Sequence, residues 1–247
     1  MSVASLTQRS GGVIGTIGPI GGKGVWSLKE RGALAQDFYD NVSLYLKMNG
    51  ANGSTTFYDS SKNGHVVTAN GNAQISTAQS KFGGASAAFD GTGDYLSIAD
   101  SNSLDLGTGD FTLEMWAYIQ STGEYVLYAH AATGGPMLLF FNGSFAFRRF
   151  AVANVVTATA APARNKWVHI AACRSGTSTR LFFDGVQTGS TATDTANYTV
   201  NGSIFVGIDL PDLGALPLNG YIDDLRITKG VARYTGSFTP PARQFRP

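Results

Sequence analysis

The stretch FTLEMWAYI, residues 111–119, alternates between apolar side chains and side chains that are polar or amphipathic. Successive side chains of a β-strand point to opposite faces, so this pattern predicts a strand with one face in a core. The predicted core face carries Phe111, Leu113, Met115, Ala117 and Ile119. The predicted opposite face carries Thr112, Glu114, Trp116 and Tyr118. A two-faced strand of this kind is typical of an antiparallel sheet.

Further strand-like segments follow one another at short intervals on both sides of this stretch. They are 42–48, 86–90, 95–99, 125–130, 137–142, 144–150, 155–159, 167–174, 179–184, 186–190, 204–209 and 221–228. The pairs Asn142-Gly143 and Asp184-Gly185 lie between such segments and suit tight hairpins, because glycine accepts a positive φ. Many short strands joined by glycine turns predict an all-β fold, a β-sandwich.

Composition narrows the class of partner. The chain has 247 residues, 43% of them hydrophobic and 14% charged, with a formal net charge of +1. Because the net charge is close to zero, we expect no nucleic-acid binding. Because no run of about 20 apolar residues is present, we expect no membrane insertion. Cys173 is the single cysteine, which excludes an internal disulfide framework. The N-terminus lacks the apolar core of a secretory signal, so we expect synthesis in a cytoplasm.

Three long motifs resemble a known family. They are SAAFDGTGDYLSIADSNSLDLGTGDFTLEMWAYI at 86–119, KWVHIAACRSGTSTRLFFDGVQTGS at 166–190 and GYIDDLRITKGVARYTGSFTPP at 220–241. Together they resemble the laminin-G-like branch of the concanavalin-A-like lectin/glucanase superfamily. The resemblance implies an antiparallel jelly-roll β-sandwich over 39–240, followed by a short tail at 241–247.

The resemblance extends to a kind of domain that is especially common in bacteriophage and cyanophage virion structural proteins. It implies a non-enzymatic virion protein, made in the host cytoplasm, that forms a homo-oligomer, with a trimer as one form, and contacts other virion proteins of capsid or tail. One reading places the sandwich on a tail or fibre, where it adheres to host surface glycans. Two alternatives stay open: a capsid decoration, or cement, protein of the head, and a secreted bacterial carbohydrate-binding module.

Residues 1–38 differ from the rest of the chain. Single apolar residues are spaced by glycines there, which gives too little apolar mass for a core. One interpretation is a leader without fixed structure. The other is an extended Gly-rich arm that docks on another subunit, with apolar anchors at Ile14, Ile17, Ile20, Val25 and Trp26.

Catalysis of the glucanase type needs two carboxyl groups close together. The strand 111–119 offers Glu114 alone, and Trp116 stands where a second carboxylate is required. Asp223 and Asp224 are adjacent, so strand alternation predicts that they point to opposite faces. The three histidines are scattered and show no zinc spacing. We therefore expect no catalytic residues and no enzyme activity.

Strand alternation places Asp223 on the core face of 221–228, together with Tyr221, Leu225 and Ile227. A buried carboxylate needs a partner. The first interpretation is a set of backbone N–H donors from a neighbouring loop, and the second is an ion pair with Arg226 or Arg233. The third is calcium, which favours several oxygen ligands; its ligands would be Asp223 with Asp59 and Asn63 of a flexible loop. No cofactor is required, and calcium is the one considered.

Sugar sites combine aromatic platforms with a few polar groups. The candidate carbohydrate-binding residues are Trp116, Tyr118, Tyr125, Tyr128, Arg148 and Arg149. They line a shallow groove if the face opposite Phe111 and Leu113 is exposed. The alternative is that the sandwich, or a partner subunit, buries them.

Overall fold

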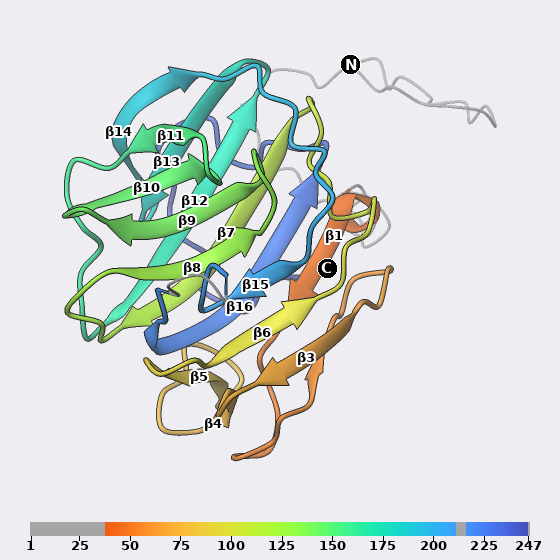
Figure 1. The fold of residues 1–247 in the computed structure, drawn as a ribbon, viewed down its shortest axis with the longest axis vertical. Helices are drawn as coiled ribbons and strands as arrows, with labels where there is room; N and C mark the ends of the chain where they lie inside the picture. The colour runs from red at the N-terminus through yellow and green to blue at the C-terminus, as the bar shows by residue number, and fades with distance from the viewer. Residues whose placement is uncertain (1–37, 211–215, 247) are drawn as a thin grey trace, which may run out of the picture.

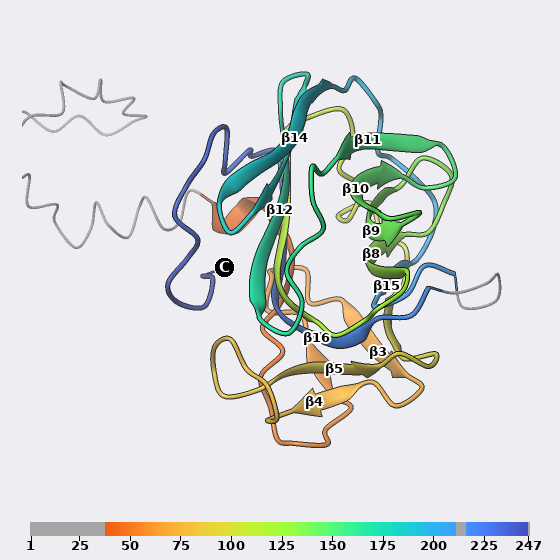
Figure 2. The same ribbon diagram turned by 90° about the vertical axis from the view of Figure 1, so that its left-hand side faces the viewer.

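The computed structural model describes residues 38–210 and 216–246, which form a sandwich of two eight-stranded antiparallel sheets (Figures 1 and 2). The short 3₁₀ helix η1 (Tyr39–Asn41) precedes the first strand. The expected all-β sandwich is confirmed. The expected anchors Ile14, Ile17, Ile20, Val25 and Trp26 lie outside the described residues.

The first sheet has the order β14-β13-β12-β7-β16-β5-β4, and β1 also pairs with β16. Its strands are β1 (Val42–Leu46), β4 (Gln74–Ser76), β5 (Ser86–Asp90), β7 (Phe111–Ile119), β12 (Trp167–Ser175), β13 (Ser178–Phe183), β14 (Val186–Thr193) and β16 (Asn219–Lys229). The second sheet has the order β11-β10-β9-β8-β15-β6-β3-β2. Its strands are β2 (Phe57–Tyr58), β3 (Val66–Asn70), β6 (Tyr95–Ile98), β8 (Tyr125–His130), β9 (Pro136–Phe141), β10 (Ser144–Arg149), β11 (Ala153–Thr157) and β15 (Ile204–Val206).

The core lies between the two sheets, as the alternation of β7 predicts. All five residues of the predicted core face of β7 are buried in one apolar cluster with side chains of both sheets. Both glycine turns also form hairpins. Asn142 and Asp184 have positive φ values of 49° and 47°, each followed by a glycine with positive φ, and they join β9 to β10 and β13 to β14. This is the turn chemistry that two-residue hairpins favour.

The closing strand β16 contains a bulge, which alters the expected faces. Asp224 has a φ of 55°, and the pairing with β7 shifts by one residue between Asp223 and Arg226. An inserted residue of this kind reverses the alternation that a regular strand would keep. Ile222 and Leu225 both join the core between the sheets.

Asp223 and Asp224 therefore both lie on the outer side of the first sheet. The half-buried Tyr221 is there too, against the ring of Tyr118, while Ile227 is in the core as expected. The expectation that Asp223 shares the core face with Tyr221, Leu225 and Ile227 is wrong. The expectation that the two aspartates point to opposite faces is wrong for the same reason.

Much of the outer face of the first sheet is covered by the end of the chain, residues 231–246. Figure 2 shows this segment, in dark blue, on the outer side of β12. The rings of Tyr234 and Phe238 stack with centroids 3.5 Å apart and pack on His169 and Phe182 of the sheet. The core of the sandwich is thus one apolar layer, and this cover is a second one.

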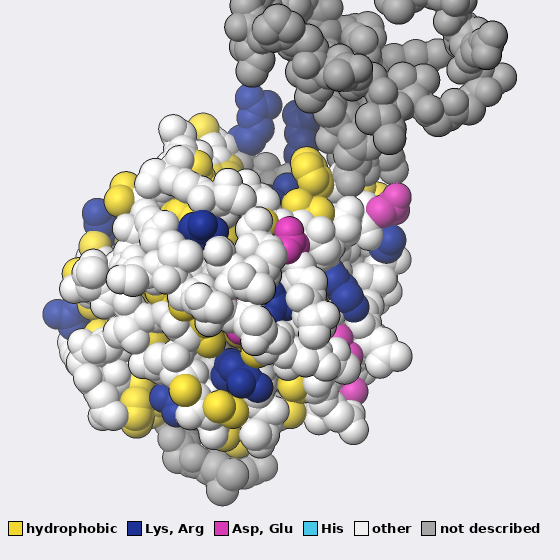
Figure 3. Space-filling view, turned by 90° about the horizontal axis from the view of Figure 1, so that it is seen from above, with side chains coloured by type: hydrophobic (Ala, Val, Ile, Leu, Met, Phe, Trp, Pro, Cys, Tyr) yellow, Lys and Arg dark blue, Asp and Glu magenta, His cyan; other side chains and the backbone are white. Residues whose placement is uncertain are grey.

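Two properties of the described residues bear on the kind of partner that the protein can bind. Seen from above Figure 1, basic and apolar side chains are interspersed among polar ones over the described residues (Figure 3). Within the described part of the chain, no helix is long and apolar enough to cross a bilayer.

Candidate functional site

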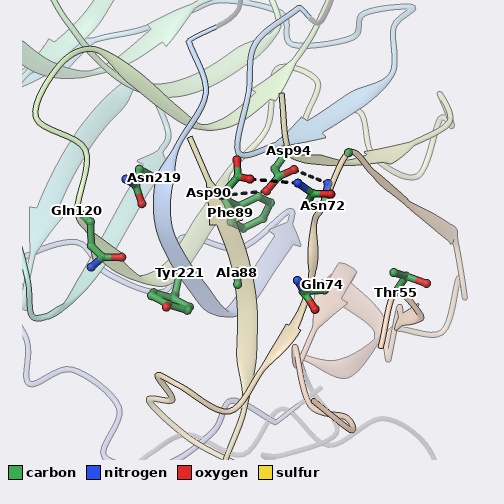
Figure 4. A pocket seen from close by; sticks show the side chains of 11 residues that line it. Thr55, Asn72, Gln74, Ala88, Phe89, Asp90, Asp94, Gln120, Asn219 and Tyr221 are labelled. Atoms are coloured by element: carbon green, nitrogen blue, oxygen red, sulfur yellow. Dashed lines mark hydrogen bonds between the residues drawn. The ribbon is translucent and has the colours of Figure 1, made fainter. Parts of the chain in front are cut away.

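A pocket of about 580 Å³ opens at one end of the first sheet (Figure 4). None of residues 231–246, the C-terminal cover, is among its lining residues. Its lining is mostly polar and exposed, with two aromatic residues, the buried Phe89 and the half-buried Tyr221. The lining residues are Thr55, Gly71, Asn72, Gln74, Ala88, Phe89, Asp90, Asp94, Gln120, Asn219 and Tyr221. Figure 4 shows Tyr221, Gln120 and Asn219 on one side of the pocket and Gln74 and Thr55 on the other. We call it the strand-end pocket.

Strand register explains why these side chains meet. Ala88 of β5 lies opposite Gln74 of β4 on one side and opposite Tyr221 of β16 on the other. Tyr221 in turn lies opposite Tyr118 of β7, and Tyr118 lies opposite Trp167 of β12. Residues that are directly paired across strands share a face. Five strands thus place one row of side chains across the outer face of the sheet.

The last three residues of that row form a continuous aromatic strip, which we call the aromatic row: Tyr221, Tyr118 and Trp167. The rings of Tyr221 and Tyr118 meet edge to face with centroids 5.9 Å apart, and those of Tyr118 and Trp167 do so at 5.7 Å. Such contacts are the preferred geometry of aromatic pairs. All three residues are half-buried, so each keeps part of its surface open to solvent.

The next row toward the strand ends is polar, and we call it the polar row: Asp90, Asn219 and Gln120. Asp90 and Asn219 are opposite one another on β5 and β16, and the Gln120 backbone N–H donates to the Asn219 carbonyl at 2.9 Å. All three side chains are exposed and line the strand-end pocket. The polar row therefore presents amide and carboxylate groups in the same pocket as Tyr221.

Asp94 fixes the loops that form the pocket wall. Its carboxylate accepts a hydrogen bond from the Asn72 backbone N–H at 2.5 Å and from the Asp90 backbone N–H at 2.9 Å. Asp94 is buried, and burial raises the pKa of this carboxyl above its ordinary value. The Asn72 side chain donates to Asp90 Oδ2 at 3.2 Å. Two turns, 71–72 and 90–94, are thereby held together, so the pocket is pre-formed.

The arrangement suits a sugar. A sugar ring has faces of C–H groups that pack on aromatic rings and a rim of hydroxyls that both donate and accept hydrogen bonds. Side-chain amides can do both as well, and a carboxylate accepts several hydrogen bonds. Ligand sites in general combine apolar contact with a few well-placed polar groups. The aromatic row and the polar row supply these two elements side by side.

The structure does not assemble the carbohydrate groove expected from the sequence. Trp116 is buried under Phe82, and Tyr125 and Tyr128 lie between the sheets in the core. Of the six expected residues, Tyr118 alone belongs to the aromatic row. Arg148 and Arg149 are half-buried on β10 of the second sheet.

The residues considered for calcium do not fit it. Both oxygens of Asp59 are occupied by hydrogen-bond donors: the N–H groups of Tyr45, Ser61 and His65, the Ser61 hydroxyl and the His65 ring. Burial raises the pKa of Asp59, but the N–H donors outweigh it and hold the pKa below its ordinary value. The Asn63 side chain donates to the Ser43 carbonyl at 2.8 Å. Within the described residues, no group of three or more His, Cys, Asp or Glu could hold a metal.

Asp223 holds the loop at Lys81 and Phe82 against the sheet. Its Oδ2 accepts hydrogen bonds from the backbone N–H groups of Lys81 and Phe82, both at 2.9 Å. The first interpretation, backbone donors from a neighbouring loop, is confirmed. The ion-pair interpretation is wrong, because Arg226 binds Glu114 and the Arg233 Nε donates to Thr228.

The comparisons with solved structures concern the fold. The binding domain of Paraclostridial Mosquitocidal Protein 1 matches with a TM-score of 0.58 and 14% identity over 82% of this chain and 50% of that chain. Domain 4 of AbnA, a GH43 extracellular arabinanase from Geobacillus stearothermophilus in complex with arabinotriose, matches with a TM-score of 0.58 and 16% identity over 78% and 94%. The receptor binding domain of botulinum neurotoxin D matches with a TM-score of 0.55 and 16% identity over 79% and 51%.

The present chain therefore spans about half the length of the two toxin domains. Comparison with curated protein sequences gave no match. A sequence family described as the concanavalin A-like lectin/glucanases superfamily matches residues 90–233, which is more than half of the chain. This range includes the buried face of β7, both glycine hairpins and the bulge of β16. The chain belongs to the concanavalin A-like lectin/glucanases superfamily.

Proposed function

We propose that this protein is a non-enzymatic glycan-binding module and that the strand-end pocket with the aromatic row is its sugar site. The observation that carries the proposal is that the two rows are neighbours on one face of the sheet and meet in the lining of one pocket. Tyr221 lines the pocket together with the amides of Gln120 and Asn219, and its ring continues into Tyr118. The arabinanase domain of the same fold was solved with a bound arabino-oligosaccharide, which favours this kind of ligand.

The absence of catalysis in this proposal is supported by the state of Glu114. The Glu114 side chain is fully buried, and its oxygens accept hydrogen bonds from Arg226, His169 and Tyr234. A general acid or nucleophile must contact the substrate, and two such carboxyl groups are needed. Glu114 has neither access to solvent nor a carboxylate partner among its hydrogen-bonding contacts.

The setting is the second part of the proposal: display on a bacteriophage particle, on the tail or fibre, as a homo-oligomer that contacts other virion proteins through residues 1–38. The support is the resemblance of the motifs at 86–119 and 220–241 to phage virion domains. In this setting the bound glycan is a host surface glycan.

The sugar site is tested with the full chain on a glycan array, followed by titration calorimetry of each glycan that binds. We expect Tyr221→Ala and Tyr118→Ala to reduce the array signal strongly. Tyr58→Ala is the matched control, because Tyr58 is 74% exposed on β2 of the other sheet. A glycan signal that survives both variants would place the sugar elsewhere and overturn the site assignment.

The particle setting is tested separately by cryo-electron microscopy of intact particles and by co-purification. We expect full-length protein to co-purify with particles and a chain that lacks residues 1–38 to be lost from them. Equal incorporation of both chains would contradict the docking role. Density on the head instead of the tail would favour a cement protein.

A further inference from the structure

The aromatic row extends beyond the strand-end pocket. Tyr221 lines the pocket, whereas Tyr118 and Trp167 lie outside it on the next two strands, β7 and β12. Both outer residues are half-buried. The strip of ring surface that starts inside the pocket thus continues away from it across the sheet.

The neighbouring rows of side chains border this strip on both sides. We call the bordered strip, from Gln74 and Ala88 through the aromatic row, the lane. On one side, the Lys81–Phe82 loop covers the next row: the Phe82 ring packs edge to face on Trp116 at 5.9 Å, and Lys81 Nζ lies 3.8 Å from the centre of the Trp116 ring system. Asp223 holds this loop in place through two N–H bonds. On the other side lies the exposed polar row, with Asn219 and Gln120. A ligand on the strip meets a wall on one flank and hydrogen-bonding groups on the other.

The lane has a definite direction and length. It runs perpendicular to the strands, from Gln74 on β4 through Ala88 and the aromatic row to Trp167 on β12. Neighbouring strands are about 4.8 Å apart, so four spacings give a length of about 19 Å. A sugar unit covers about one strand spacing, so the lane matches a chain of about four units.

From this geometry we infer that the site binds a linear glycan chain of about four sugar units laid across the strands, with one end in the strand-end pocket, rather than a single terminal sugar. The inference rests on the proposed function. Trp167 is its distal contact and Tyr221 its proximal one. The small side chain of Ala88 between Gln74 and Tyr221 leaves room for the unit that enters the pocket.

The test uses the full chain and neutral oligosaccharides of one to six units from five polymers: glucan, mannan, galactan, xylan and arabinan. Each series is applied to an array and then measured by calorimetry. We expect affinity in the bound series to rise at least about 10-fold between two and four units and then to level off. Trp167→Ala should reduce that rise, with a loss of roughly 2- to 10-fold for four units, while two-unit ligands bind as before.

Tyr221→Ala should weaken ligands of every length, and Trp167→Phe should keep most of the rise. Melting curves of each variant confirm that the sheet is folded. Equal affinity for one unit and four units, or a Trp167→Ala variant with an unchanged length dependence, would overturn the chain site but leave a sugar site at Tyr221. If none of the five series binds, the proposed function fails together with this inference.

Discussion

Arg226 donates two hydrogen bonds to a single oxygen of Glu114, from Nε at 3.0 Å and from Nη2 at 2.6 Å, and both side chains are buried. The pair lies on the outer face of the first sheet, beneath the C-terminal cover. Arg226 also donates to the carbonyl of Arg246 at 2.8 Å, and its guanidinium lies 4.1 Å from the Phe245 ring centre. The ion pair therefore fastens the end of the chain to the sheet.

Removal of one partner from this buried pair should be strongly destabilising. Arg226→Met leaves the Glu114 carboxylate buried without its cation, so we expect a loss of about 3–5 kcal/mol in the free energy of unfolding. Urea denaturation followed by fluorescence measures this loss. Lys62→Met is the control, because the exposed pair of Lys62 and Asp40, 3.6 Å apart, should contribute less than about 1 kcal/mol. Similar small effects for both variants would contradict the fastening role.

Stability should depend on pH in two opposite ways. Burial raises the pKa of Asp223 to about 7 and that of Asp224 to about 6, above the value near 3.9 of an unfolded chain. Between these values the folded state binds more protons than the unfolded state. This contribution to stability is complete below about pH 4 and is lost as the pH rises through about 6 to 7.

Glu114 acts in the other direction. Its burial raises the pKa, but Arg226 and His169 outweigh burial and lower the pKa to about 2. The Glu114 contribution is therefore present above about pH 4.3 and is lost as the pH falls toward 2. We expect the melting temperature to peak at about pH 4–5 and to fall by several degrees by pH 8. Asp223→Asn should flatten the upper limb; a wild-type curve that rises from pH 5 to 8 would contradict the assignment.

The sequence predicts the strands with strong patterns and misses those without them. The alternation of 111–119 and the two glycine turns lead directly to β7 and to two hairpins, as found. The strands β2, β3 and β4 were not predicted, because two of them have only two or three residues and the third, Val66–Asn70, turns only Val67 and Ala69 toward the core, both partly buried.

The bulge at Asp224 could not be predicted from alternation, since alternation assumes a regular strand. The candidate site could not be assembled for a related reason. Tyr118 was a candidate, but its neighbours Tyr221 and Trp167 come from strands far away in the sequence. Periodicity tells which face a residue occupies within its strand, whereas the order of strands in the sheet decides which residues become neighbours. That order, β12-β7-β16-β5, has no local signature in the chain.

Alanine at Gly71, in the pocket wall, should destabilise the protein more than alanine at Gly93. Gly71 and Gly93 both have positive φ, 65° and 74°, so alanine costs about 1 kcal/mol of backbone strain at either position. A Cβ on Gly71 would lie 2.6 Å from Asp94 Oδ1, whereas a Cβ on Gly93 has nothing within 4 Å. We expect Gly71→Ala to cost about 1–3 kcal/mol more than Gly93→Ala and to reduce glycan binding as well. Calorimetric melting and the array signal measure both effects; equal losses would mean that Asp94 does not fix the wall.

The strand-end pocket should discriminate against anionic sugars. Its described lining residues include Asp90 and Asp94 but neither Lys nor Arg, so a carboxylate or sulfate on the sugar unit in the pocket meets negative charge without a counter-ion. Two like charges about 4 Å apart in water repel by about 1 kcal/mol, so an anionic form of a bound glycan should bind roughly 5-fold more weakly than the neutral form.

Asp90→Asn should remove much of this difference, and so should high salt, because the Asp90 side chain is exposed. Asp40→Asn, with a side chain that is 72% exposed outside the pocket, serves as the control and should leave the ratio unchanged. The measurement is calorimetry with neutral and uronic acid forms of one oligosaccharide at low and high salt. Tighter binding of the anionic form that Asp90→Asn does not alter would show that the sugar does not occupy the strand-end pocket.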